Sequence, residues 1–205
     1  LHAGIGQGYF TSTPLQLCLM TAQLANGGFK LKPRIVVDEN DQANSLQKYL
    51  DFRKKNLNDL TSIDQQVFNF NLQPLFRNQE NINFVKNAMF AASNEPGGTS
   101  YGSRHEDKKF MFAGKTGSSQ IRRFTQAQRE AEVKQTEIEY LKRDHAWFVA
   151  FAPVDDPKYA ISVLVEHGGS GSSAAAPVAK KVIKKVIERH EIRKEANSLQ
   201  LGKNI

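Results

Sequence analysis

The tripeptide Lys115-Thr116-Gly117 is the clearest group of residues in this sequence that could do chemistry. It follows the apolar run at residues 110–113, which we predict to be a strand, so the group would stand at the end of that strand. The lysine supplies a positive charge, and the threonine hydroxyl can donate a hydrogen bond to a substrate carboxylate. Glycine has no Cβ, so a ligand backbone can approach the strand closely. The alternative is an ordinary strand end with a solvated lysine.

A phosphate-binding loop is a second mechanism that uses such a group, since Gly114-Lys115-Thr116 matches the end of its motif. That motif needs an earlier glycine, and Lys109 stands at its position. The bulky Phe110 and Phe112 between them would keep the backbone from wrapping a phosphate. We therefore exclude a phosphate loop.

Helix signals at the start of the chain are strong. Ser12 or Thr13 can cap a helix whose first turn holds Pro14, and apolar residues recur at helical spacing over residues 15–25. The sequence Asn26-Gly27-Gly28 should end that helix. Residues 38–80 are polar, and we expect strands and loops there, as a variable insertion. A second helix is predicted over residues 81–93, with these side chains inward: Ile82, Val85, Ala88 and Met89.

The last third predicts the sheet. Residues 146–152 and 159–165 alternate as strands around the turn Asp155-Asp156-Pro157-Lys158. A long helix follows Pro177, and we expect one side of it to be buried, formed by Val178, Val182, Ile183, Val186 and Ile187. The charged residues 122–143 are predicted to be a loop with a helical piece, and residues 193–205 a frayed tail. These elements make an α+β fold, an antiparallel sheet with packed helices.

Composition limits the function classes. A chain of 205 residues favours one domain, and no apolar stretch is long enough to span a membrane. The chain opens at Leu1 with neither Met nor a signal peptide, so we expect a piece of a longer protein. The formal charge of +7 is spread out, and the lysines at 180–181 and 184–185 fit a solvated helix face. We therefore exclude a nucleic-acid-binding domain.

Other chemically capable residues carry weaker signals. The single cysteine, Cys18, lies in an apolar pattern and is predicted to be a small buried residue. His105 sits in a charged run and is expected to be a solvated loop residue. His145 could hydrogen-bond Asp144 structurally, and a structural role is also favoured for His167, near the expected cleft. No spacing predicts a metal site, and no cofactor is expected.

Several segments, in family order, resemble the class B penicillin-binding proteins, and in particular their elongation-type members. They are Gly4-Ile5-Gly6-Gln7-Gly8 with Thr13-Pro14-Leu15-Gln16-Leu17, the Lys-Thr-Gly strand, Arg143-Asp144-His145-Ala146-Trp147-Phe148-Val149-Ala150-Phe151-Ala152-Pro153, and Val165-Glu166-His167-Gly168-Gly169-Ser170-Gly171 with Ala175-Ala176-Pro177-Val178-Ala179. The resemblance covers nearly the whole chain. It implies that residues 1–205 are the C-terminal portion of one transpeptidase domain.

The resemblance also implies roles for individual residues. Lys115 would lie at the cleft and help proton transfer and electrostatics. Thr116 would bind the carboxylate of a donor peptide or of a β-lactam, and Gly117 would keep the strand edge open. The backbone N–H of Ser118 would form half of the oxyanion hole, with the other half on the nucleophile.

The nucleophile is the main departure from the family pattern. The family attacks with the serine of a Ser-x-x-Lys motif upstream of the glycine-rich segment. Ser45-Leu46-Gln47-Lys48 matches this spacing, but it lies downstream and in a polar stretch, where no buried helix is expected. Ser62-Ile63-Asp64 is a similar chance match to the second motif. We therefore predict that this chain alone is inactive, because covalent catalysis needs the nucleophile and its base within hydrogen-bond reach.

The family implies a peptidoglycan D,D-transpeptidase that cross-links stem peptides and is a target of β-lactams. The full protein would be anchored at the periplasmic face of the bacterial inner membrane. Its partners would be the missing N-terminal half of the domain and the elongation machinery of the cell wall. The alternative is a non-catalytic remnant, or a module that binds wall peptides.

Overall fold

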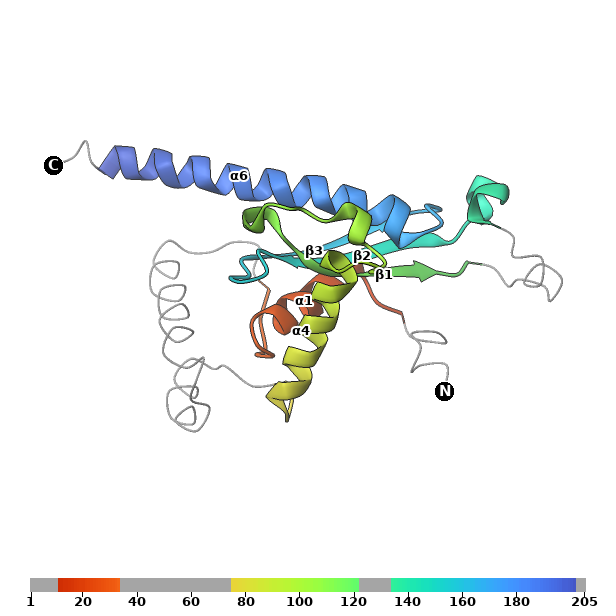
Figure 1. Ribbon diagram of the computed structural model, residues 1–205, viewed down its shortest axis with the longest axis horizontal. Coiled ribbons are helices and arrows are strands. Elements are labelled where there is room, and N and C mark those ends of the chain that lie inside the picture. The colour runs from red at the N-terminus through yellow and green to blue at the C-terminus, as the bar shows by residue number, and fades with distance from the viewer. Residues whose placement is uncertain (1–10, 34–74, 122–133, 202–205) are drawn as a thin grey trace.

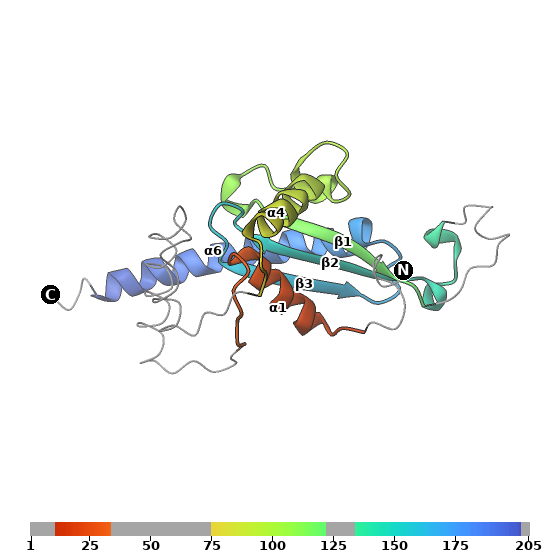
Figure 2. The ribbon, with the colours of Figure 1, turned by 90° about the horizontal axis from the view of Figure 1, so that it is seen from below.

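The computed structural model describes residues 11–33, 75–121 and 134–201, and in these ranges helices cover both faces of one antiparallel sheet (Figure 1). The strands are β1 (Ala113–Ser119), β2 (His145–Ala152) and β3 (Tyr159–Val165), in the order β1-β2-β3. Helix α6 (Ala176–Leu201) lies on one face. Helices α1 (Pro14–Ala25) and α4 (Gln79–Asn94) lie on the other, α1 toward β3 and α4 toward β1 (Figure 2). The predicted α+β class is confirmed.

Helix α1 begins and ends where the sequence signals place it. The Thr13 hydroxyl accepts the Gln16 backbone N–H, and the Gln16 side chain accepts the Thr13 N–H, so the two residues form a capping box. At the other end, Gly27 and Gly28 both have positive φ angles, 97° and 89°, which glycine adopts without strain. The chain therefore turns sharply after Asn26.

Strands β2 and β3 lie where the sequence predicts them, and β2 is the central strand, between β1 and β3. Its even-numbered residues, from Ala146 to Ala152, are fully buried against α6, together with Phe112. On the opposite face Phe151 packs with Ala113 and with residues of α1 and α4. Because β2 contributes buried side chains to both faces of the sheet, it forms the centre of the described core.

Strand β1 begins later than the sequence indicates. Residues 110–113 were expected to be the strand, but Lys108–Phe110 form a 3-10 turn, started by the Asp107 carboxylate, which accepts the Lys109 N–H. The strand therefore contains Lys115-Thr116-Gly117 rather than leading into it. All seven residues of β1 pair with β2, from Ala113 opposite Phe151 to Ser119 opposite His145.

The buried side of α6 differs from the prediction. Ile183 and Ile187 are buried as expected, but Val178, Val182 and Val186 are 43%, 40% and 38% exposed. Ala176 and Ala179 take their place against the sheet, fully buried. The small alanine side chains let the helix approach β2 closely. Helix α6 starts after a π-helical turn, Gly171–Ala175.

The prediction for the second helix was partly wrong. Ile82 and Met89 of α4 are buried, whereas Val85 and Ala88 are exposed. The helix also spans two more residues at its start and one more at its end than expected. It begins within the stretch 38–80, whose remaining residues up to 74 lie outside the described ranges.

Some predictions concern residues outside the described ranges. These residues are the glycine-rich segment 4–8, the Ser45 and Ser62 motifs, and residues 122–133. Residues 134–143 hold two short 3-10 turns, Gln135–Glu137 and Tyr140–Lys142. Helix α6 continues past residue 193, where a frayed tail was expected, to Leu201. None of the helices within the described ranges combines the length and the apolar character needed to cross a membrane.

Candidate active site

The outer edge of β1 is the structural feature on which the candidate site is built. In an antiparallel ladder the N–H and C=O of one residue point to the same side, and successive residues alternate. The Gly114 N–H points away from β2, because it donates to the Ser93 hydroxyl (3.0 Å). By the same alternation, the N–H and C=O groups of Thr116 and Ser118 also point away from β2. Among the described residues no strand pairs with this side of β1.

Lys115 and Thr116 place three polar groups at this edge. The Lys115 ammonium donates to the Thr116 carbonyl (2.7 Å), which confirms that this carbonyl faces outward. The Thr116 hydroxyl donates to the hydroxyl of Thr99 (3.1 Å). Lys115 is exposed and Thr116 half-buried, so a ligand lying along the edge could reach both side chains.

Gly117 leaves room on the sheet face that carries Lys115. Cross-strand partners share a face, and the partners of Lys115 and Gly117 are Val149 and Trp147. A Cβ at Gly117 would meet the Trp147 Cβ at 3.4 Å, an ordinary contact, and would stand beside the lysine. Glycine therefore leaves the surface beside Lys115 without a further side chain.

The Ser118 N–H points to the open edge by alternation, two residues beyond Thr116. The Ser118 hydroxyl is occupied elsewhere, since it donates to the Gly169 carbonyl (3.3 Å). The backbone N–H, not the hydroxyl, is thus the group that Ser118 offers at the edge. The edge carries a cation, a hydroxyl and an amide donor in sequence, a set suited to a carboxylate and to a developing oxyanion.

A buried pair of serines fixes the start of β1 against the end of α4, and the sequence gave no signal for it. Ser93 and Ser100 are 0% and 2% exposed. Their hydroxyls lie 3.0 Å apart, and Ser100 Oγ donates to the Ala92 carbonyl (3.0 Å). A hydroxyl has one hydrogen, so Ser93 donates to Ser100 while accepting the Gly114 N–H. This chain of hydrogen bonds joins helix, turn and strand.

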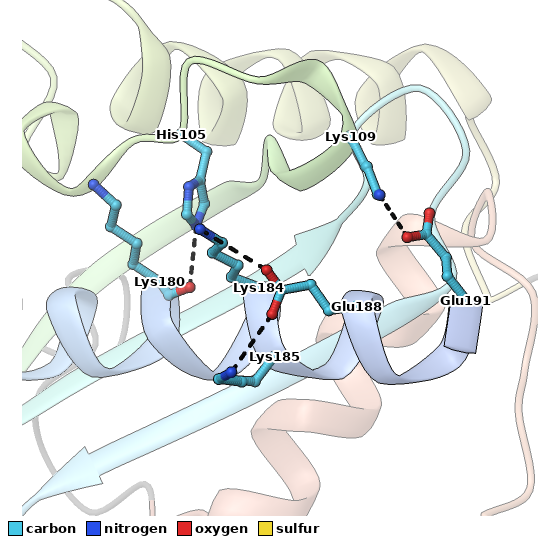
Figure 3. Close-up of polar contacts among 7 residues, drawn as sticks. All are labelled: His105, Lys109, Lys180, Lys184, Lys185, Glu188 and Glu191. Carbon is cyan, nitrogen blue, oxygen red and sulfur yellow. Dashed lines mark hydrogen bonds and ion pairs between the residues drawn. The ribbon is translucent and has the colours of Figure 1, made fainter. Parts of the chain in front are cut away.

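The segment between α4 and β1 also contacts α6, through His105 and Lys109 (Figure 3). His105 was expected to be solvated, but it is half-buried, because its Nε2–H donates to the Lys180 carbonyl (3.1 Å). Its ring packs on Phe110 and Phe112. Farther along, Lys109 pairs with Glu191, whose carboxylate raises the pKa of that lysine. The segment is therefore bound to α6 at two points.

The exposed lysines of α6 are partly neutralised, as expected for a solvated helix face. Lys184 and Lys185 both lie within ion-pair distance of Glu188, at 3.9 and 3.7 Å (Figure 3). Such exposed pairs contribute little to stability.

His145 and His167 contact each other beside Ser119, the last residue of β1, which pairs with His145. The His167 N–H donates to His145 Nδ1 (2.9 Å), and the two rings meet edge to face at 4.7 Å. The predicted bond from His145 to Asp144 is replaced, because the Asp144 carboxylate accepts from the Gln135 amide (2.8 Å). His167 has a left-handed backbone, φ 55°. These contacts give both histidines structural partners.

Cys18 is half-buried in α1, where its thiol donates to the Ala160 carbonyl of β3 (3.4 Å). Burial raises the pKa of this thiol. Across the described ranges, no three His, Cys, Asp or Glu side chains gather in a way that could hold a metal ion.

Comparisons with known proteins agree on one family. The model of the penicillin-binding protein transpeptidase domain matches residues 1–184. The chain is 31% identical over 189 residues to the peptidoglycan D,D-transpeptidase MrdA of Haemophilus influenzae, covering 89% of this chain and 25% of that protein. It is 33% identical over 181 residues to MrdA of Acinetobacter baumannii, covering 87% and 23%. The chain thus spans about a quarter of the length of these relatives.

Solved structures give the same result. The fold resembles the penicillin-binding protein PBP2 of Helicobacter pylori, solved in a complex with MreC, with a TM-score of 0.61 and 27% identity over 91% of this chain and 26% of that one. It also resembles PBP2 of Pseudomonas aeruginosa, with a TM-score of 0.53 and 28% identity over 88% and 31%. The resemblance expected from the sequence is confirmed.

Proposed function

Because the chain belongs to the penicillin-binding protein transpeptidase domain family, we propose that it is the part of a peptidoglycan D,D-transpeptidase that supplies the substrate-binding strand and half of the oxyanion hole. The observation that carries this proposal is the open edge of β1. There Lys115, the Thr116 hydroxyl and the Ser118 N–H lie in sequence on one strand.

Each group has one task in serine acyl transfer. A serine elsewhere in the full-length protein attacks a carbonyl carbon of the donor stem peptide, and its proton passes to a nearby base. The Ser118 N–H stabilises the oxyanion that forms, so it acts mainly on the transition state. The amide C–N bond then breaks, and the departing amine takes up the proton held by the base. An acceptor amine later attacks the acyl carbon, loses a proton to the base and displaces the serine oxygen, which regains its proton as the cross-link forms.

Lys115 and Thr116 hold the donor in place. The ammonium makes the edge attractive to an anionic ligand, and the Thr116 hydroxyl donates to its carboxylate. A β-lactam presents a carboxylate and a strained carbonyl in a similar arrangement, so the same groups would bind it. Gly117 keeps space beside the lysine for the ligand.

The chain spans about a quarter of its relatives' length, and we assign the rest of the domain to another segment of the full-length protein. The valine row of α6, Val178, Val182 and Val186, is exposed, and β3 lies at an edge of the described sheet. Apolar rows of this kind are usually covered in a folded domain. We assign the cover to the N-terminal part of the domain, which would also carry the nucleophile.

The setting follows from the same family. Cell-wall cross-linking takes place outside the cytoplasmic membrane, so the protein would work at the periplasmic face with its anchor in the remaining sequence. The Helicobacter pylori relative was solved in a complex with MreC. A place in the elongation machinery of the cell wall is therefore part of the proposal.

Intact-mass spectrometry before and after incubation with penicillin tests the proposal. We expect one penicillin adduct on the full-length protein, at a serine upstream of Leu1, and none on residues 1–205 alone. An adduct at Ser45 of the isolated chain would overturn the assignment of the nucleophile. A full-length protein that gains no adduct would favour the alternative, a module that binds wall peptides without reacting.

A further inference from the structure

Thr99 is an exposed residue that neither the motif nor the comparisons single out, yet its hydroxyl contacts the key hydroxyl of the candidate site. Thr116 Oγ1 donates to Thr99 Oγ1 at 3.1 Å. The two residues are separated by 17 positions in the sequence. Contact between them therefore depends on how the turn after α4 is placed beside β1.

That turn is built to hold its position. Gly97 has a φ of 87°, which reverses the chain after α4, and Gly98 lies against the last turn of the helix. A Cβ at Gly98 would stand 2.5 Å from the Ala92 carbonyl oxygen, so only glycine fits. The next residue after Thr99, Ser100, is buried in the hydrogen-bond chain to Gly114. Thr99 is thus held between two fixed residues.

The Thr99 hydroxyl, held in this way, can orient the neighbouring Thr116 hydroxyl. Each hydroxyl donates one hydrogen bond and can accept two. With the edge empty, the Thr116 hydroxyl donates to Thr99. When a carboxylate arrives, Thr116 turns its hydrogen to the ligand, and Thr99 can turn its own hydrogen to the Thr116 oxygen. Donation into that oxygen strengthens the outgoing hydrogen bond, because linked hydrogen bonds polarise one another.

We propose that Thr99 is a positioning residue for carboxylate recognition: it holds the Thr116 hydroxyl at the open edge and supports it as a donor. This role rests on the proposed function of the edge. It predicts a specific dependence, since Thr99 acts through Thr116 and only on ligands that carry the carboxylate.

The test measures acylation rate constants of the full-length protein by benzylpenicillin and by its uncharged methyl ester. In this reaction the serine Oγ bonds to the lactam carbonyl carbon, the lactam C–N bond breaks, and the ring nitrogen takes the proton. The variants are Thr99→Val, Thr99→Ser, Thr116→Val and the Thr99→Val/Thr116→Val double variant. Thr136→Val, at another exposed threonine, is the matched control.

With benzylpenicillin, we expect Thr99→Val to lower the acylation rate constant by about 2- to 12-fold, the range of one neutral hydrogen bond. Thr99→Ser should restore the rate, because serine keeps the hydroxyl. The double variant should react no more slowly than Thr116→Val alone. With the methyl ester, Thr99→Val should match the unchanged protein, as Thr136→Val should with both ligands.

Three results would overturn this role while leaving the proposed function intact: an unchanged rate in Thr99→Val, an equal loss with the ester, or a further loss in the Thr116→Val background. The last would mean that Thr99 contacts the ligand directly. If the unchanged protein is acylated by neither ligand, the proposed function itself fails, and the role of Thr99 with it.

Discussion

Replacing Ser93 by alanine should loosen the start of β1 at one identifiable amide. The Ser93 hydroxyl accepts the Gly114 N–H at 3.0 Å and donates to Ser100, and it is fully buried. Alanine keeps the helix and fits the space, but it offers no acceptor. The Gly114 N–H would then be left without its partner in a site that water does not reach.

The size of the effect follows from this loss. A buried donor left unsatisfied costs about 1–3 kcal/mol, more than the net value of an average hydrogen bond. Ser100 keeps its bond to the Ala92 carbonyl, so the damage is concentrated at Gly114. If local opening becomes easier by that amount, exchange of the Gly114 amide hydrogen should accelerate about 5- to 150-fold.

Hydrogen exchange followed by mass spectrometry on the full-length protein measures this directly, in peptides that contain Gly114. Ser173→Ala, at an exposed serine, is the control and should leave the amide unchanged. If Ser93→Ala exchanges at Gly114 no faster than Ser173→Ala does, then the serine pair does not anchor the strand. These serines would then not fix the turn that places Thr99 beside Thr116 either.

Three further predictions test other parts of the structure. Gly98→Ala should lower the free energy of unfolding by about 1–3 kcal/mol, because the new Cβ would collide with carbonyl oxygens of α4. Gly102→Ala, whose Cβ would stand in open space, is the control, and equal melting temperatures of the two variants would refute the predicted collision. Ile183→Ala should lower the free energy of unfolding of the chain 1–205 by about 2–5 kcal/mol, and the neighbouring Val182→Ala should lower it much less. The reverse order in urea unfolding would contradict the observed buried face of α6. The Cys18 thiol should be alkylated more slowly than free cysteine at pH 8, because its raised pKa lowers the thiolate fraction; equal rates would count against its burial.

The elements that the sequence predicts well are those whose signals are local. Helix α1 has its cap at Thr13 and its stop at Gly27, both set by neighbouring residues. Strands β2 and β3 follow alternating side chains on either side of a Pro157 turn. None of these depends on what packs against the element.

The face of α6 could not be predicted, because its sequence carries two apolar rows. Valines recur every four residues from Val178, and a second row runs through Ala179, Ile183 and Ile187. The prediction joined the valines to Ile183 and Ile187 on one buried side. The sheet buries only the second row, because the small Ala179 at its start allows close packing against β2.

The limits of β1 were missed because its local sequence signals are weak at residues 114–119 and misleading at residues 110–112. Residues 114–119 contain two glycines, one lysine and two serines, none of which favours a strand, and only Thr116 is of a strand-favouring type. Residues 110–112 are apolar and read as strand, but the Asp107 side chain starts a 3-10 turn there. Pairing with β2 imposes the extended conformation where the local sequence does not. Thr99 and Ser93 were missed too, because their contacts exist only once α4 and β1 are side by side.

A strand of such weak intrinsic preference must be fixed from outside, and the structure shows how. Strand β2 binds its inner edge, Ser93 and Asn94 of α4 bind the backbone at Gly114 and Phe112, and α6 covers Phe112. These contacts hold the first half of the strand and leave the outer edge from Thr116 to Ser118 for a ligand. Donors held by the fold need not reorganise when charge develops on a bound carbonyl, and this is what lowers an acyl-transfer barrier. The glycines that weaken β1 as a strand are thus among the residues that our proposal uses at its edge, and the neighbouring elements offset their cost in stability.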